Sequence, residues 1–193
     1  MIEQLYSEFD TDITIRPIEG KTFYQDRINI DLIRDNTHIA NASRVIEEVV
    51  ILKHEDKWVN ANLYAVDSIF STITNMKNHM VDGEPKLFED GQSFGVIGAT
   101  LLDKLDGFIP KQGNETIVCY LPKKKIKIRV GKNPFRMEVV KISGRINYNR
   151  EVNLNSMIIP IELAQEILES ENRISAVYVD VKPDYSNEEA KSV

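Results

Sequence analysis

Hydrophobic and polar residues alternate with two different periods along this 193-residue chain. Strict alternation over residues 58–66 and the β-branched residues of 45–52 both predict strands, and the sequence HEDK between them predicts a hairpin turn. Two further alternating runs, KIKIRV at 125–130 and FRMEVVKI at 135–142, are joined by GKNP and predict a second hairpin. Additional strands are predicted at 12–17, 115–122 and 174–182.

Helical spacing occurs in shorter stretches between these strands. Residues 25–35 carry an apolar stripe that includes Leu32, which predicts an amphipathic helix. Asp67 is a candidate N-cap of a short helix, and strand-then-helix patterns occupy residues 93–105 and 155–169. Because strands and helices are mixed without a regular βα repeat, the sequence predicts an α+β fold rather than a doubly wound sheet.

Both ends of the sequence have the character of cut ends. Ile2, Leu5, Tyr6 and Phe9 fall at helical spacing directly at the start, and the closing NEEAKSV begins a helix without continuing it. No run approaches the roughly 18 apolar residues of a membrane-spanning helix, and no leader pattern opens the chain. We therefore expect a fragment of a longer protein, so that targeting signals can lie outside it.

Charge is distributed unevenly along the chain. The 24 basic and 30 acidic residues give a net charge of −6, which argues against a general nucleic-acid or anionic-membrane binder. Seven basic residues and no acidic residue lie between Lys123 and Arg136, so the other 17 basic residues face 30 acidic residues, a net charge of −13. This segment, called the basic strip below, is either a charged guard or a docking surface.

Catalytic chemistry finds little support in the sequence. Glu47 and Glu48 are adjacent and would point to opposite faces of a strand, and GVIGA at 95–99 lacks the residues that a phosphate loop requires. Cys119 lies in an apolar run that predicts a buried strand thiol. The histidines lack a carboxylate or cysteine at metal-ligand spacing, and they are His38, His54 and His79. We therefore expect no enzyme activity, no cofactor and no metal.

Seven segments, taken in order, coincide with one family. They are NASRVIEEVVIL, NLYAVDSIF, GVIGATLLDKL, YLP before the basic strip, ISGRI after it, SMIIPIELAQEIL and ISAVYVDVK. This ordered set spans about residues 6–181 and resembles the periplasmic domain of LolC/LolE-type lipoprotein-releasing ABC transporter permeases. These proteins share a MacB-like periplasmic core with the FtsX-like permease superfamily.

The resemblance implies an α+β fold with two lobes. Residues 10–72 and 155–193 would form a Porter-like lobe from both ends of the chain, and residues 73–154 would form an inserted Sabre-like lobe with a basic hairpin. Family members continue past the NEEAK region with another strand and helix, so we expect the Porter-like lobe to be truncated here. In the family this domain lies between the first two spans of an inner membrane protein, which implies that the fragment is periplasmic.

The function implied by the resemblance is to help release lipoproteins from the inner membrane and hand them to a periplasmic chaperone. The implied partners are a LolA-like chaperone, the lipoprotein cargo and, through the missing membrane part, an ATPase subunit and a second permease copy. Nucleic acid is not among them. The LolC-like, LolE-like and combined branches stay open, as does a MacB-like efflux or FtsX-like mechanotransmission permease. A cytosolic nucleic-acid-binding domain and a small enzyme are the alternatives from other classes.

In the LolC branch a hairpin of the Sabre lobe, the hook, captures the chaperone, and the basic strip lies at the matching position. Pro134 and Arg136 resemble residues of its returning arm, whereas residues 129–131 occupy the place of its apex proline. The resemblance thus implies a set of partner-binding residues. They are Lys123, Lys124, Lys125, Ile126, Lys127, Ile128, Arg129, Val130, Gly131, Lys132, Pro134 and Arg136.

Strand alternation gives the basic strip two different faces. It places Lys125, Lys127 and Arg129 on one face, and three β-branched residues on the other. The basic face would steer a partner of opposite charge, and the apolar face would be buried on docking. The alternatives are an edge strand protected by lysines against aggregation and a nucleic-acid contact, which the near absence of interleaved aromatic residues disfavours.

Overall fold

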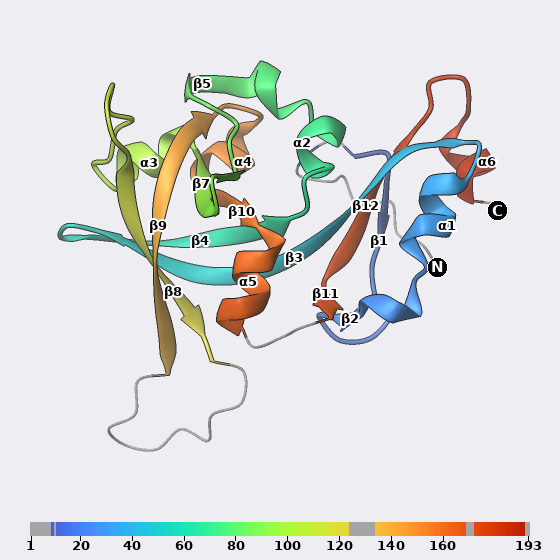
Figure 1. Cartoon of the computed structure of the whole chain (residues 1–193), viewed down its shortest axis with the longest axis horizontal. Coiled ribbons are helices and arrows are strands. Elements are labelled where there is room, and N and C mark those ends of the chain that lie inside the picture. The colour runs from blue at the N-terminus through green and yellow to red at the C-terminus, as the bar shows by residue number, and fades with distance from the viewer. Residues whose placement is uncertain (1–8, 10, 124–133, 169–171, 192–193) are drawn as a thin grey trace.

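The computed structural model describes residues 9, 11–123, 134–168 and 172–191, and it confirms the α+β class (Figure 1). The strands are β1 (Ile13–Ile15), β2 (Phe23–Tyr24), β3 (Ile39–His54), β4 (Lys57–Val66), β5 (Met80–Gly83), β6 (Phe88–Glu89), β7 (Gln92–Gly98), β8 (Glu115–Pro122), β9 (Phe135–Ile146), β10 (Ser156–Pro160), β11 (Arg173–Ile174) and β12 (Ala176–Val181). The helices are α1 (Ile30–Asp35), α2 (Phe70–Ile73), α3 (Ala99–Lys104), α4 (Arg150–Asn155), α5 (Ile161–Leu168) and α6 (Asn187–Lys191), with 3-10 turns η1 (Gln25–Arg27) and η2 (Met76–His79).

A long hairpin of β3 and β4 forms the centre of the main sheet. Its antiparallel register runs from Val45 opposite Val66 to His54 opposite Lys57. The predicted HEDK turn is confirmed, and Glu55 takes a positive φ of 47° there. The sheet continues on both sides of this hairpin, in the order β1-β12-β3-β4-β10-β7-β9-β5, with β8 bridging β3 and β9.

β1 and β12, which are the first and last strands of the main sheet in the sequence, pair with each other. β1 is antiparallel to β12, with Ile13 opposite Val179, and β12 in turn pairs with the first half of β3. The Asp12 carboxylate accepts a hydrogen bond from the backbone N–H of Val181 at 2.8 Å. The prediction that these two strong strands lie in one sheet is confirmed. The lobe boundaries after residues 72 and 154 stay a prediction.

Apolar side chains pack on both faces of this sheet. One face buries Val50, Leu52 and Leu63 in a cluster that also includes residues of α3 and α5. The other face buries Tyr64 and Val66 in a second cluster, where the ring of Phe9 packs edge-on. Each of these two clusters covers only part of its face of the sheet. Within the described part of the chain, no helix combines the length and hydrophobicity needed to cross a bilayer.

Two local predictions are corrected by the structure. The helix expected over 25–35 begins only at Ile30, because the Asn29 side chain caps it by accepting from the N–H of Leu32 at 3.2 Å. Leu32 is 68% exposed rather than buried on the predicted stripe. The segment FRMEVVKI pairs with ETIVCYLP in β8, from Pro122 opposite Phe135, whereas its predicted hairpin partner KIKIRV lies outside the described residues. The connection between these paired strands is therefore longer than the predicted GKNP turn.

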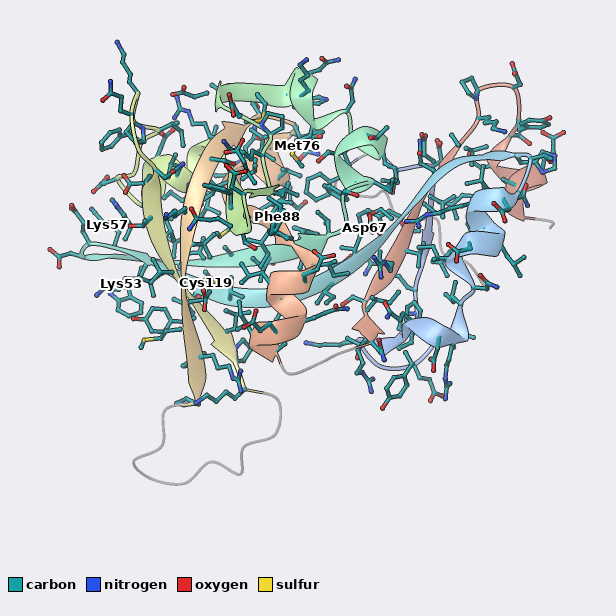
Figure 2. All side chains as sticks on the ribbon, viewed as in Figure 1. Lys53, Lys57, Asp67, Met76, Phe88 and Cys119 are labelled. Carbon is teal, nitrogen blue, oxygen red and sulfur yellow. The ribbon has the colours of Figure 1, made fainter. Side chains whose placement is uncertain are left out.

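Asp67 has a different role from the predicted helix cap. Figure 2 shows it between β3 and α2, and its side chain is 6% exposed. The carboxylate accepts hydrogen bonds from Ser43 Oγ at 2.7 Å, from the backbone N–H of Arg44 at 3.1 Å and from Arg44 Nε at 3.2 Å. Arg34 Nη2 lies 3.3 Å from the same carboxylate and also donates to a backbone carbonyl of β3. Asp67 therefore ties the start of β3 to the helix before it.

Replacing Asp67 with alanine is expected to lower the free energy of unfolding by about 3 kcal/mol, because the change leaves two part-buried arginines without their shared counter-charge. Urea unfolding followed by circular dichroism measures this loss. Asp184, which is exposed, provides the matched control, and its replacement with alanine should leave stability nearly unchanged. Equal stabilities of the two variants would contradict a structural role for Asp67.

Candidate partner-binding site

The structure describes only part of the basic strip. The Lys123 N–H donates to the carbonyl of Pro134 at 2.9 Å, which closes the β8–β9 pair at its end. Lys123 and Pro134 are exposed, and Arg136 is half-buried. The remaining predicted site residues lie outside the described residues, so the division of their side chains between two faces stays a prediction. They are Lys124, Lys125, Ile126, Lys127, Ile128, Arg129, Val130, Gly131 and Lys132.

The strip begins and ends on a well-ordered antiparallel pair. β8 and β9 are in register from Glu115 opposite Ile142 to Pro122 opposite Phe135. β3 pairs with β8 over only three residues, from Ile51 to Lys53, so the β8–β9 pair crosses the end of the central hairpin (Figure 1). Beyond that crossing the pair extends away from β3. The two described ends of the basic strip, Lys123 and Pro134, therefore lie side by side at the end of this pair.

One face of this crossing is closed by packing. Leu52, Cys119 and Leu121 are each at most 1% exposed, and α5 covers them together with Val140 of β9. Because side chains alternate along a strand, the residues before and after each of these positions point to the opposite face. Here the predicted buried strand thiol of Cys119 is confirmed.

No other described segment covers the opposite face, and it carries a group of exposed apolar side chains. Cross-strand register aligns it in two rows: Trp58, Lys53, Val118 and Val139, then Asn60, Ile51, Tyr120 and Met137. With Val49 these residues are called the open sheet face below. Val49, Trp58, Met137 and Val139 are 54–61% exposed. A contiguous apolar group of this kind marks an interaction surface more often than a chance exposure does.

An aromatic ladder connects the open sheet face to the strip. The rings of Trp58 and Tyr120 lie 5.0 Å apart, and Phe135 meets Tyr120 edge-on at 6.5 Å. Lys53 Nζ lies 5.2 Å from the centre of the Trp58 ring, a cation–π contact that keeps the charge at the surface. Figure 2 shows Lys53 and Lys57 at this end of the molecule, close to Cys119. The two rows contain one lysine and no acidic residue, so the face is apolar with a positive bias.

A groove of 570 Å³ lies on the other side of the β8–β9 pair, against α5. Lys123 and Arg136 line it together with Glu138 of β9 and Glu166 of α5. Burial raises the pKa of the Glu138 carboxyl above its usual range, and the nearby charge of Glu166 raises it further. The groove therefore holds both signs of charge, in contrast to the open sheet face.

The residues considered for catalysis do not come together. Burial, with a smaller contribution from Glu138, raises the pKa of the Cys119 thiol to about 12, so it is not a thiolate at neutral pH. Glu47 accepts two hydrogen bonds from Arg16, at 2.7 and 2.8 Å, and a third from Tyr178. His54 contacts a backbone carbonyl and Glu115. Over the described residues, no three acidic, histidine or cysteine side chains form a group that could hold a metal.

The open sheet face was missed by sequence reasoning. Alternation in FRMEVVKI does separate Met137 and Val139 from Val140, but both sets are apolar, so the pattern cannot tell which face is covered. Trp58 begins a predicted strand, where a half-buried residue is expected more often than an exposed partner contact, and it is 54% exposed at the β4 edge of the face. The sequence does contain a signal, because neighbouring strands carry apolar residues at both odd and even positions. That signal identifies a face only when the pairing of the strands is known.

Replacing Glu138 with glutamine is expected to stabilise the fold more at about pH 7 than at about pH 4. The folded-state pKa is raised, so ionisation costs stability above that pKa, and the cost disappears below the ordinary value of 4.5. Urea unfolding at both pH values measures the difference. Glu162, exposed on the same helix as Glu166, is the matched control, and its glutamine variant should show no such dependence. A larger effect of Glu138→Gln at low pH would contradict the assignment.

No protein-family model and no curated protein matches the chain, but solved structures do. The extracellular domain of the noncanonic ABC-type transporter YknZ from Gram-positive bacteria matches with a TM-score of 0.61 and 15% identity, over 90% of this chain and 79% of that chain. The periplasmic region of MacB from Actinobacillus actinomycetemcomitans matches with a TM-score of 0.61 and 12% identity, over 93% of this chain and 78% of that chain. The chain therefore has the α+β fold of MacB-like periplasmic domains.

Proposed function

We propose that this chain is the periplasmic domain of an inner-membrane ABC transporter permease that helps release lipoproteins and hand them to a periplasmic chaperone. The fold supports the coarser part of this proposal, since it matches extracytoplasmic domains of two ABC-type transporters over at least 90% of the chain. The finer part rests on the basic strip and the surface beside it. The proposal includes no catalytic activity of the domain itself.

The observation that carries the finer part is the continuity of the open sheet face with the base of the basic strip. Phe135, the first residue of β9, contacts Tyr120 within the face and lies next to Pro134 of the strip. A partner that meets the lysines and arginines of the strip can therefore bury the apolar rows in the same encounter. Hydrophobic burial supplies affinity, and the surrounding positive charge supplies rate and orientation.

The arrangement of the chain ends suits a domain attached to a membrane through both of them. β1 and β12 are paired, and the Asn187 side chain of α6 donates to the backbone carbonyl of Asp12 at 3.2 Å. A force on β1 would therefore pass to β12 and, through β12, to β3. In the proposed transporter, a separate ATPase subunit supplies the energy and a second permease copy completes the pathway for the lipoprotein.

A MacB-like efflux permease and an FtsX-like mechanotransmission permease are the second candidates, because the fold suits them equally well. The specific feature that favours chaperone transfer is the concentration of seven basic residues in the basic strip of an otherwise acidic chain. A LolC-like, LolE-like or combined branch fits this feature, and the LolC-like branch fits it best because its hook lies at this position.

Reversing three charges of the strip, by changing Lys125, Lys127 and Arg129 to glutamate, should slow association with a LolA-like chaperone. Charges at the rim of an interface act mainly by steering, and salt screens their field over roughly 8–10 Å. Surface plasmon resonance at low and high salt should show a lower association rate, a weak change in dissociation rate and a smaller salt dependence than in the original protein.

A control with the same change in net charge separates local steering from the overall field. Lys77, Lys111 and Arg150 are exposed and lie away from the strip in sequence. Changing these three to glutamate should affect association much less. Equal slowing by both triple variants would show that the strip has no special role.

Replacing residues 124–133 with Asn-Gly should abolish chaperone binding and leave the domain folded. The new two-residue turn would join Lys123 to Pro134, which already share a backbone hydrogen bond, and Asn-Gly suits the tight turn of such a hairpin. Thermal unfolding and chaperone binding are measured on the same sample. Loss of folding would place the segment in the core, and unchanged binding by a folded variant would reduce the strip to a guard of the sheet edge.

A further inference from the structure

A second, separate feature is a cavity of 710 Å³ between the end of β1, the β2–β11 pair and η1. Its size lies within the range of about 300–1,000 Å³ that is typical of small-molecule sites. Figure 1 shows β2 and β11 on the far side of α5 from the β8–β9 pair, so this cavity is distinct from the open sheet face. The residues that matter for its chemistry are Arg16, Ile18, Phe23, Tyr24, Arg27 and Arg173.

Arg173 is held in place by neutral groups. Its Nε donates to Thr22 Oγ1 at 2.9 Å and its Nη2 donates to the Thr22 carbonyl at 3.0 Å. The guanidinium carbon also lies 4.7 Å from the centre of the Tyr24 ring, and Tyr24 is the cross-strand partner of Arg173. These contacts fix the orientation of the guanidinium without neutralising it. Its Nη1 group makes none of these bonds and can donate to a ligand.

The positive charge of the cavity is only partly compensated. Arg16 is paired with Glu47, which removes it as a free cation. Arg27 is exposed, and over the described part of the chain neither Arg27 nor Arg173 makes an ion pair. Glu19 is the acidic residue among those that line the cavity. In a protein with a net charge of −6, two arginines in one cavity that form no ion pair with any described residue favour an anionic ligand.

Apart from the arginines, Glu19 and Thr22, the lining of the cavity is mostly apolar. Ile18 is 98% exposed at the rim, and Pro17, Phe23 and Ile28 also line the cavity. A free inorganic anion would leave this surface and most of the volume unused. An anion with an attached apolar portion would use both parts of the lining.

We propose that this cavity binds a phosphate monoester that carries an apolar portion. Arg27 and Arg173 bind the phosphate oxygens, and the apolar portion contacts Ile18 and Phe23. Two arginine forks match a phosphate monoester, which has three strong acceptor oxygens and a charge of about −1.5 to −2, better than they match a singly charged carboxylate. The group can belong to a lipid headgroup or to a soluble organic phosphate.

Isothermal titration of the folded domain with three probes tests the proposal. Dihexanoyl phosphatidic acid carries both recognised parts, glycerol 3-phosphate carries the phosphate alone, and dihexanoyl phosphatidylcholine carries the same chains without a monoester. We expect the first to bind and the third not to bind. Tighter binding of the first probe than of the second supports a lipid source, because only the first carries the apolar portion. Equal binding of the two would show that the apolar portion makes no contact with Ile18 and Phe23.

Arg27→Gln is the decisive variant, because Arg27 is exposed and its loss should not disturb the fold. It should weaken phosphatidic acid binding by about tenfold or more, as expected for a charge-assisted hydrogen bond. Arg150→Gln makes the same charge change at an exposed position of α4 and should leave the affinity for phosphatidic acid unchanged.

Four results would overturn the proposal: no binding of any probe, equal binding of glycerol 3-phosphate and phosphatidic acid, equal binding of phosphatidylcholine and phosphatidic acid, or unchanged affinity of the Arg27→Gln variant. Chaperone binding by the same variant should be normal. This site and the proposed function can therefore fail independently.

Discussion

The length and pairing of β3 set the geometry of everything else in this domain. Its 16 residues extend over about 50 Å, and β4 pairs with ten of them. On its other edge, the first half pairs with β12 and the end pairs with β8. Side chains alternate along a strand, so a slip of one residue would expose Val50 and Leu52 and bury Lys53. One register thus positions both the β1–β12 pair and the β8–β9 pair.

The same strand explains why the open sheet face exists. Near β12, Phe9 and α2 cover one face of the sheet, and Tyr64 and Tyr178 are buried there. These coverings end before β3 reaches β8, while α5 continues to cover the opposite face. The rows around Ile51 are therefore apolar without a cover. A sheet that needed only stability would place polar residues in those rows, because antiparallel sheets commonly keep one solvated face.

Sequence pattern was sufficient where a structure depends on local periodicity. The strands at 45–52 and 58–66, the HEDK turn and the buried thiol of Cys119 follow from alternation and turn chemistry alone. It was insufficient where a partner far along the chain decides the outcome. Asp67 looks like an ordinary helix cap until β3 places Ser43 and Arg44 beside it. The pairing of β9 with β8, and with it the open sheet face, likewise depends on contacts that no short segment reveals.

The two cationic regions differ in a way that suits different tasks. The basic strip is rich in lysine, whose ammonium group is compact, strongly hydrated and carried on a flexible side chain. Its charge acts over a distance, and the group stays hydrated until a partner binds. The cavity beside the β2–β11 pair uses arginine, with Arg173 oriented by Thr22 and Tyr24 before any ligand is present. Pre-oriented donors lose little freedom on binding, so they favour affinity for a small anion. Steering of a large partner and capture of a small ligand can therefore coexist on one acidic domain, because they need different cations at separate places.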